Sequence, residues 1–301
     1  MRISTNGIHL EVQDDGPTGG ETVLLLMGLG MQLTAWPDSL VRDLVRRRFR
    51  VIRLDNRDAG LSTGFDAAGM PNLVTATLRY ALRRPVPSPY TLGDMAHDAI
   101  GVLDALGLGR VHVCGVSMGG MVAQHLAASH PERVASLLLV MTSSGARHLP
   151  GPHANVRRLM MRRLPDGAPR DAIVAHLERL WLAIGSPGFP PDREQLRQRL
   201  QASVERAWRP AGTARQLVAI AADGGRPALL RRVKAPTHVM HGRDDPLIPV
   251  EAAHDLHGRI PGSTLDVIPG MGHDLPEPLM PRLAAAIAEA ASRATRPDPA
   301  P

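Results

Sequence analysis

Short continuous runs of apolar residues alternate along this chain with stretches in which apolar residues recur every three or four positions. The first pattern predicts strands that are buried on both faces, and the second predicts helices with one face in a core. Strands and helices that alternate in this way build a parallel sheet through right-handed crossovers, so an α/β fold is predicted. The predicted buried strands are Thr22–Met27, Phe49–Asp55, a run that ends just before Ser117, Val134–Met141, Pro236–His241 and Thr264–Ile268.

A hairpin is predicted before the first buried strand. Asn6-Gly7 stands between two short alternating segments, Arg2–Thr5 and Ile8–Gln13. This dipeptide accepts the positive φ angles of a two-residue turn.

A helix start is predicted at Thr91, because Asp94 follows it at the spacing of a capping box. The segment before it, from about Phe65 to Pro89, has mixed polarity and is expected to be a peripheral excursion with a helical piece around Thr75–Arg84.

The strand pattern disappears from Arg147 to about Arg232. Apolar residues in this segment fall at helical spacing and prolines punctuate it, which predicts a helical insertion. The expected organisation is 1–146 as the first part of one core, 147–232 as a helical cap, 233–295 as the second part of the core and 296–301 as a disordered tail.

Composition limits the classes of binding partner and the cellular location that we expect. The formal charge is +6, but the arginines are scattered without interleaved aromatic residues, so nucleic acid is not expected as a partner. No apolar run approaches about 18 residues and the first residues lack the apolar centre of a signal peptide, so we expect no membrane insertion and a cytoplasmic location. Cys114 is the only cysteine, which excludes an internal disulfide, and its apolar surroundings predict a buried, unreactive thiol.

The strongest chemical signal is Gly115-Val116-Ser117-Met118-Gly119, which lies between a predicted strand and a predicted helix. In this setting the motif predicts a nucleophile elbow, where a sharp, strained turn exposes the serine hydroxyl and the glycines prevent collisions. The N–H of Met118 would be the first of the helix and would have no partner in it, so it could bind an oxyanion.

A serine nucleophile needs a base, and in a strand-turn-helix elbow the chain order is serine, acid, histidine. Three histidines lie beyond any acid that fits this order: His254, His257 and His273. The first two are three residues apart in a helical pattern, which favours surface positions. His273 follows the strand Thr264–Ile268 in a turn-rich loop and is the predicted base.

The acid is predicted in the loop after Pro236–His241, where two aspartates qualify. Asp245 is preferred over Asp244, because Pro246 biases the preceding residue to extended backbone. His241 has no second ligand at metal-binding spacing, so neither a metal nor another cofactor is implied.

Taken together, these motifs resemble the α/β-hydrolase superfamily over nearly the whole chain. Met27-Gly28-Leu29-Gly30 stands where that family has His-Gly-x-Gly, Asp55–Ser62 resembles its Asp-x-Arg-Gly-x-Gly-x-Ser and Gly242–Asp245 its Gly-x-x-Asp. The sequence is most similar to bacterial carboxylesterases of the aclacinomycin methylesterase and heroin esterase type. The resemblance implies that Leu29 N–H is the second oxyanion donor and that the helical insertion is the family's cap. Met27 in place of His and Asp58 in place of Gly are departures from the family pattern.

The expected function is hydrolysis of a small-molecule carboxylic ester through an acyl-enzyme on Ser117, with His273 as base and Asp245 as its partner. Leu159, Met160 and Met161 in the insertion suggest an apolar or mid-sized substrate, and Trp181 is a candidate substrate contact. Cofactor-free haloperoxidase or perhydrolase chemistry and C–C bond hydrolysis with the same triad remain alternatives, as does a ligand receptor on the same fold that performs no catalysis. The sequence leaves the oligomeric state open.

Overall fold

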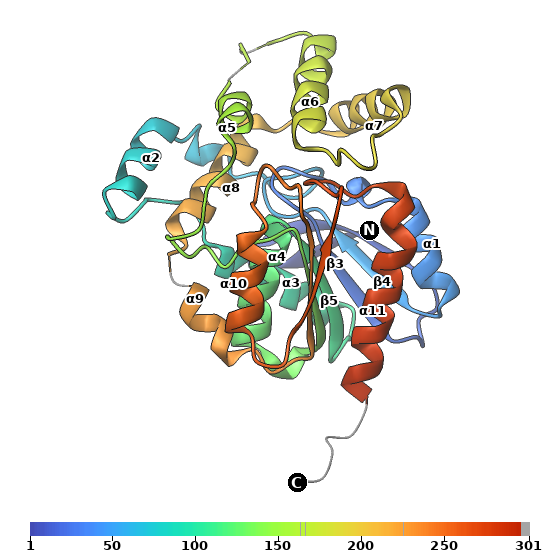
Figure 1. Ribbon diagram of the computed structural model, residues 1–301. Coiled ribbons are helices and arrows are strands. Elements are labelled where there is room, and N and C mark those ends of the chain that lie inside the picture. Colours follow the sequence, from blue (N-terminus) through green and yellow to red (C-terminus); the bar gives the residue numbers. More distant parts are fainter. Residues whose placement is uncertain (163, 166, 225, 296–301) are drawn as a thin grey trace.

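The computed structural model describes residues 1–162, 164–165, 167–224 and 226–295, and within them an eight-stranded sheet forms the centre of the molecule (Figure 1). The strand order is β1-β2-β4-β3-β5-β6-β7-β8. β1 and β2 run antiparallel to their neighbours, and every pair from β4–β3 to β7–β8 is parallel. This confirms the predicted α/β fold. The strands are β1 Arg2–Thr5, β2 Ile8–Asp15, β3 Thr22–Leu26, β4 Arg50–Leu54, β5 Val111–Val116, β6 Val134–Val140, β7 Thr237–Gly242 and β8 Thr264–Ile268.

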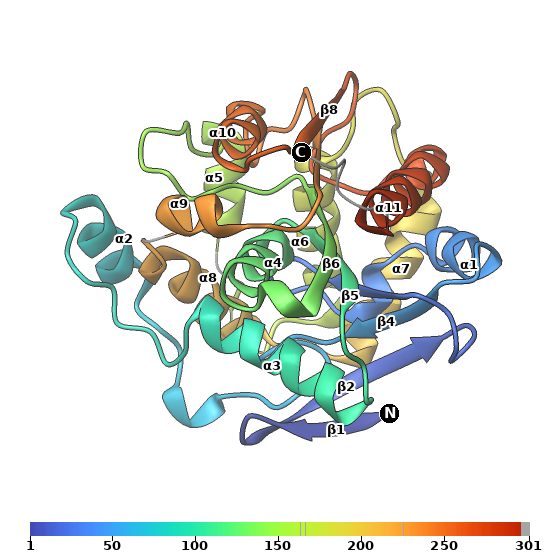
Figure 2. The ribbon, with the colours of Figure 1, turned by 90° about the horizontal axis from the view of Figure 1, so that it is seen from below.

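Helices cover both faces of the sheet, which explains why the central strands are continuously apolar (Figure 2). Successive side chains of a strand point to opposite faces. In β3, Leu24 and Leu26 pack with helices α3 and α4, while Val23 and Leu25 pack with α1 and α11 on the other face. These helices are α1 Asp38–Arg46, α3 Leu92–Ala105, α4 Met118–Ser129 and α11 Met280–Thr295, and α10 Glu251–Arg259 lies on the α3–α4 face.

The hairpin predicted from Asn6-Gly7 is confirmed. Asn6 has φ 49° and Gly7 has φ 74°, and Thr5 pairs directly with Ile8 across the turn. Both central residues therefore adopt the left-handed backbone that a two-residue hairpin loop of this twist requires.

The capping box is confirmed as well. The Asp94 N–H donates to Thr91 Oγ1 at 3.0 Å, and the Thr91 N–H donates to Asp94 Oδ2 at 2.7 Å, at the start of α3. The excursion before it contains α2 Leu73–Ala81, which projects from the body of the molecule beside α8 (Figure 1).

The segment between β6 and β7 is helical, and its helices pack in two different places. α5 Ala154–Met160, α6 Arg170–Ile184 and α7 Arg193–Arg206 lie beyond one end of the sheet (Figure 1). α6 and α7 share a small core of their own, which includes Val174 and Leu200. By contrast, α8 Pro210–Ala222 and the short α9 Arg226–Leu229 with the turn after it pack against the main core through Ala219 and Leu230. The predicted cap, 147–232, thus combines an outer helical layer with helices that flank the sheet.

Three further properties bear on the sequence predictions. Among the described residues, no helix combines the length and the apolarity needed to cross a membrane. Cys114 on β5 is 1 % exposed, and burial raises the pKa of its thiol. The predicted disordered tail, 296–301, lies outside the described residues.

Candidate active site

Ser117 lies where β5 ends and α4 begins, as the elbow motif predicted. Its backbone has φ 53° and ψ −119°, a conformation that costs a residue with a side chain about 1–3 kcal/mol. The sharp turn leaves Ser117 half-buried, although Val116 and Met118 on either side are fully buried. The strained backbone therefore presents the hydroxyl outward from a rigid setting.

The glycines of the motif allow the strand and the helix to approach each other closely. A Cβ atom on Gly115 would lie 2.5 Å from the carbonyl oxygen of Gly119, and a Cβ on Gly119 would lie 2.1 Å from that of Leu26. Both distances are far inside van der Waals contact, so only glycine fits at these two positions.

His273 reaches Ser117 from the loop between β8 and α11. Its Nε2 atom lies 3.0 Å from Ser117 Oγ, and the residue is 6 % exposed. The backbone N–H of His273 donates to the carbonyl oxygen of Ile184, at the end of α6, at 2.7 Å. A neutral imidazole in this position can accept the hydroxyl proton, which is the geometry of a serine nucleophile and its base.

Asp245, in the loop after β7, completes the line of side chains. Its Oδ2 lies 2.7 Å from His273 Nδ1, while Oδ1 accepts the N–H groups of Leu247 at 2.9 Å and Ile248 at 2.8 Å. Burial alone would raise the pKa of this carboxyl, but attraction to His273 and hydrogen bonds from His241 and His273 outweigh it and hold the pKa well below its ordinary value. Asp245 is therefore an anion fixed against the imidazole.

Asp244 points elsewhere. Its Oδ2 accepts the N–H of Gly270 at 2.7 Å, and the residue is exposed. Of the two aspartates that the sequence offered, Asp245 is the one that contacts His273.

A second histidine touches the same carboxylate. His241, on β7, is fully buried, and its Nε2 lies 2.8 Å from the carbonyl oxygen of Ile248 and 3.4 Å from Asp245 Oδ2. Because a carbonyl oxygen only accepts, Nε2 must carry the proton. Within the part of the chain that the structure describes, no group of three or more His, Cys, Asp or Glu is arranged to hold a metal ion.

The two N–H groups proposed for an oxyanion belong to Met118, the residue after Ser117, and to Leu29, the residue after Gly28. Met118 is the first residue of α4, so its N–H has no partner within the helix. Leu29 follows Gly28, and a Cβ on Gly28 would lie 3.3 Å from Ser117 Cβ and 3.8 Å from Ser117 Oγ. Gly28, in the loop after β3, therefore packs against the Ser117 side chain.

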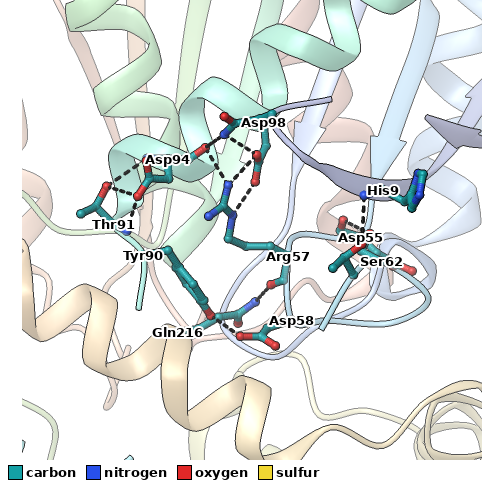
Figure 3. A network of polar contacts seen from close by, with 12 residues as sticks. His9, Asp55, Arg57, Asp58, Ser62, Tyr90, Thr91, Asp94, Asp98 and Gln216 are labelled. Atoms are coloured by element: carbon teal, nitrogen blue, oxygen red, sulfur yellow. Dashed lines mark hydrogen bonds and ion pairs between the residues drawn. The ribbon is translucent and has the colours of Figure 1, made fainter. Parts of the chain in front are cut away.

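Asp58, a departure from the family pattern, has a structural role in the loop after β4 (Figure 3). It adopts φ 67° and is 1 % exposed. Its carboxylate accepts bonds from Arg215 of α8 at 2.7 and 2.8 Å and from the hydroxyl of Tyr90 at 2.8 Å. Its own burial raises the pKa, yet these donors, with the N–H of Phe65, bring it below the ordinary value. The aspartate thus anchors α8 to the loop as an anion.

Trp181, the candidate substrate contact, lies on α6. It is partly buried and packs against the shared core of α6 and α7, so the structure gives it a packing role and does not link it to Ser117. A cleft of about 490 Å³ has Leu61, Arg206 and Trp208 among its lining residues, but Trp181, Ser117 and His273 do not line it. The hydrogen-bonded side chains Ser117, His273 and Asp245 therefore lie outside the lining of this cleft.

Sequence reasoning missed two side chains that hold the site together. His241 was considered only as a metal ligand, although a polar residue in a buried strand must find a partner. Asn56 donates to the carbonyl oxygen of Met27 at 3.0 Å and ties the loop after β4 to the loop after β3. The buried position of His241 was a usable signal, whereas the target of Asn56 depends on tertiary contacts.

Comparison with known proteins gives concordant results. A family model described as the alpha/beta hydrolase fold matches residues 21–277. Rhodomycin D methylesterase DauP of a Streptomyces species is 27% identical over 303 residues, covering 95% of each chain. A 2-hydroxy-6-oxononadienedioate/2-hydroxy-6-oxononatrienedioate hydrolase of Burkholderia vietnamiensis is 27% identical over 281 residues, covering 91% of this chain and 88% of the relative. Among solved structures, a meta-cleavage product hydrolase of Pseudomonas fluorescens superposes with a TM-score of 0.74 at 20% identity over 98% of both chains, a likeness of fold.

Proposed function

Since this chain belongs to the α/β-hydrolase family, we propose that it is a serine hydrolase that cleaves carboxylic esters through an acyl-enzyme on Ser117. One observation carries the proposal. His273 Nε2 lies 3.0 Å from Ser117 Oγ, and Asp245 Oδ2 lies 2.7 Å from His273 Nδ1. Nucleophile, base and orienting anion are thus in one hydrogen-bonded line at the strained end of a strand.

Acylation follows from this line. Ser117 Oγ attacks the ester carbonyl as its proton passes to His273 Nε2, and the new imidazolium is stabilised by Asp245. The carbonyl oxygen becomes an oxyanion, which the N–H groups of Leu29 and Met118 bind. The tetrahedral species collapses when His273 returns the proton to the alcohol oxygen, so that the C–O bond breaks and the alcohol leaves.

Deacylation repeats these steps with water. His273 takes a proton from a water molecule, the hydroxide adds to the acyl carbon, and Ser117 Oγ leaves with the proton from His273. The products are the carboxylic acid and free enzyme. None of these steps requires a cofactor.

The insertion is proposed to cap this site. We assign residues 147–232 to the cap, because the end of α6 binds the backbone of His273 through Ile184 and a Cβ on Gly272 would lie 2.4 Å from the carbonyl oxygen of Gly185. Trp181 remains a proposed substrate contact. The methylesterase relative supports an apolar or mid-sized acid esterified to a small alcohol as the substrate class.

The test is hydrolysis of p-nitrophenyl and methyl esters of graded acyl length by wild type and by Ser117→Ala. Ser129→Ala, at an exposed serine, is the matched control. Ser117→Ala should lose about 10⁴-fold or more in kcat/KM, whereas Ser129→Ala should keep wild-type activity. A fluorophosphonate should add its mass to the peptide that contains Ser117 and to no other serine peptide. Wild-type turnover by Ser117→Ala would rule out the proposal.

C–C bond hydrolysis is the second candidate, and it is favoured by the relative from Burkholderia vietnamiensis. The same three side chains can serve it, because the base and the oxyanion donors act on a carbonyl in either reaction. Loss of absorbance from a 2-hydroxy-6-oxodienoate without any ester turnover would select this reaction over the first. Turnover of neither substrate, nor of hydrogen peroxide with a carboxylic acid, would favour a receptor.

A further inference from the structure

The oxyanion loop, Met27–Met31, is held from both ends by amide side chains. Asn56 Nδ2 donates to the carbonyl oxygen of Met27 at 3.0 Å, and the N–H of Gly30 donates to Gln216 Oε1 at 2.7 Å. The peptide that carries the Leu29 N–H lies between these two anchors. Its position relative to Ser117 therefore depends on both.

The loop itself is a tight turn. The N–H of Met31 donates to the carbonyl oxygen of Gly28 at 3.1 Å, and Gly30 has φ 67° while Leu29 does not have a positive φ. These features define a type II turn with glycine at its third position. Type I and type II turns differ by a flip of the central peptide, and here the N–H of that peptide is the one that Gln216 binds.

The amide of Gln216 can adopt only one orientation. Its Nε2 donates to the carbonyl oxygen of Arg57 at 2.7 Å, and its Oε1 accepts from Gly30. Since Gly30 N–H is a donor and the Arg57 carbonyl is an acceptor, a flipped amide would lose both bonds. Gln216 is fully buried, and Figure 3 shows its side chain against the backbone of Arg57. It joins the loop after β3 to the loop after β4.

Helix α8 is itself fixed against these loops. Arg215, the neighbour of Gln216, binds both carboxylate oxygens of Asp58. A Cβ on Gly212 would lie 2.2 Å from the carbonyl oxygen of Asp58, and a Cβ on Gly30 would lie 2.6 Å from Thr213 Oγ1. The helix cannot slide or rotate without a collision or the loss of the ion pair. The position of the Gln216 side chain relative to the turn Gly28–Met31 is therefore fixed.

From this arrangement we infer that Gln216 is a positioning residue for the oxyanion hole: it holds the turn Gly28–Met31 so that the Leu29 N–H is aimed at the oxygen of the tetrahedral intermediate. The inference rests on the proposed serine mechanism. It assigns to α8, a helix within the predicted insertion, a role in stabilising the transition state. Preorganised donors of this kind act without rearrangement during the reaction.

The size of the effect follows from what a misplaced donor costs. Removal of one oxyanion donor lowers kcat by about 10²- to 10³-fold, and a displacement by about 1 Å can cost up to 10²-fold. Loss of the Gln216 amide does not remove the Leu29 N–H, but it releases the central peptide of the turn, so that the N–H is no longer held in its orientation. We therefore expect kcat to fall by about 10- to 100-fold, with KM changed by less than about threefold.

The first experiment compares Gln216→Met with Gln124→Met. Gln124 on α4 is also fully buried, and its amide is hydrogen-bonded at both ends to residues outside the oxyanion loop, Ser143 and Arg226. Both variants lose a buried amide of the same size, so a loss of stability should be common to both. Only Gln216→Met should lower kcat, and only Gln216→Met should bind a trifluoromethyl ketone analogue of the substrate more weakly, by the same factor as kcat. An ether analogue without the carbonyl should bind both variants like wild type.

The second experiment uses Gln216→Glu and does not depend on the methionine variant being folded. A protonated carboxyl can accept from Gly30 and donate to Arg57, whereas an ionised carboxylate loses the second bond. Burial raises the pKa of such a carboxyl. The ratio of kcat for Gln216→Glu to kcat for wild type should therefore rise as pH falls from 8 to 5.5, and taking the ratio cancels any pH effect that both enzymes share.

The outcomes are decisive in either direction. The inference is overturned if Gln216→Met keeps kcat within twofold of wild type, if it weakens the ketone and the ether equally, or if the Gln216→Glu ratio is flat with pH. Failure of the serine mechanism itself would appear separately, as full activity of Ser117→Ala.

Discussion

Replacement of Asp245 by asparagine should leave His273 in place but prevent it from acting as the base. Asp245 Oδ1 accepts the N–H groups of Leu247 and Ile248 at 2.9 and 2.8 Å, so the oxygen of an asparagine is held at that position and its NH₂ group replaces Oδ2. That NH₂ then lies about 2.7 Å from His273 Nδ1 and must donate to it. His273 is forced into the tautomer with its proton on Nε2, which faces Ser117 Oγ and cannot accept from it.

The expected loss of kcat follows from the position of the His273 proton, which is on Nε2 in the variant. A triad with the wrong tautomer loses about 10⁴-fold in kcat. Each factor of ten corresponds to about 1.36 kcal/mol of activation free energy, so Asp245→Asn raises the barrier by about 5 kcal/mol. Folding should survive, because the shape of the side chain and both bonds to backbone N–H groups are kept.

The assay is kcat/KM for a p-nitrophenyl ester at pH 7.5, together with the rate of labelling by a fluorophosphonate. Asp244→Asn is the matched control, since this neighbouring aspartate is exposed and accepts one backbone N–H, from Gly270, that an amide oxygen can also accept. Asp244→Asn should stay within about twofold of wild type. A folded Asp245→Asn enzyme with activity within tenfold of wild type would refute the tautomer argument, and a larger loss in Asp244→Asn would reassign the acid.

Two further predictions concern stability. Ser117→Gly should be more stable than Ser117→Ala by about 1 kcal/mol in free energy of unfolding, because glycine accepts φ 53° without strain. Its unfolding midpoint in differential scanning calorimetry should be higher, and equal midpoints would contradict this. Asp58→Asn should lower the free energy of unfolding by about 3 kcal/mol at pH 7, since the buried Arg215 loses its buried anion and keeps only the exposed Asp66. The native pKa of Asp58 is lowered, so wild type has this stabilisation above about pH 4 and loses it as pH falls through the lowered pKa. Urea titrations should therefore show the deficit of Asp58→Asn shrinking at acid pH, and a deficit independent of pH would show that the ion pair is not its source.

The elements that the sequence predicted well have signals that act over a few residues. Asn6-Gly7 sets its own turn, and Thr91 with Asp94 caps its own helix. The apolar runs predicted the buried strands because a strand covered on both faces has no polar side. The same local reasoning predicted that Ser117 sits in a strained elbow, and the backbone angles agree.

The contacts that the sequence did not reveal are those between loops far apart in the chain. Gln216 and Arg215 are polar residues in a helical pattern, which usually indicates a solvated face, yet both are buried against the loops after β3 and β4. Their partners lie more than a hundred residues away, so no periodicity encodes them. The division of the insertion into an outer layer and the core-bound α8 has the same origin, because only packing against Asp58 and Gly30 distinguishes α8 from its neighbours.

The direct pairing of β6 with β7 separates the sheet from the long excursion between these strands. Leu137 lies opposite Thr237, so the long excursion between these strands leaves the sheet and rejoins it at adjacent rows. The side chains of the proposed triad stand on the loops after β5, β7 and β8, and the excursion meets them where the carbonyl oxygen of Ile184, at the end of α6, accepts the N–H of His273. If α8 must remain to brace the turn at Gly30 and the end of α6 must remain against the His273 loop, the exchangeable portion is the rest of the outer layer. Substrate preference would then change with the outer layer, while the proposed triad keeps its place on the sheet.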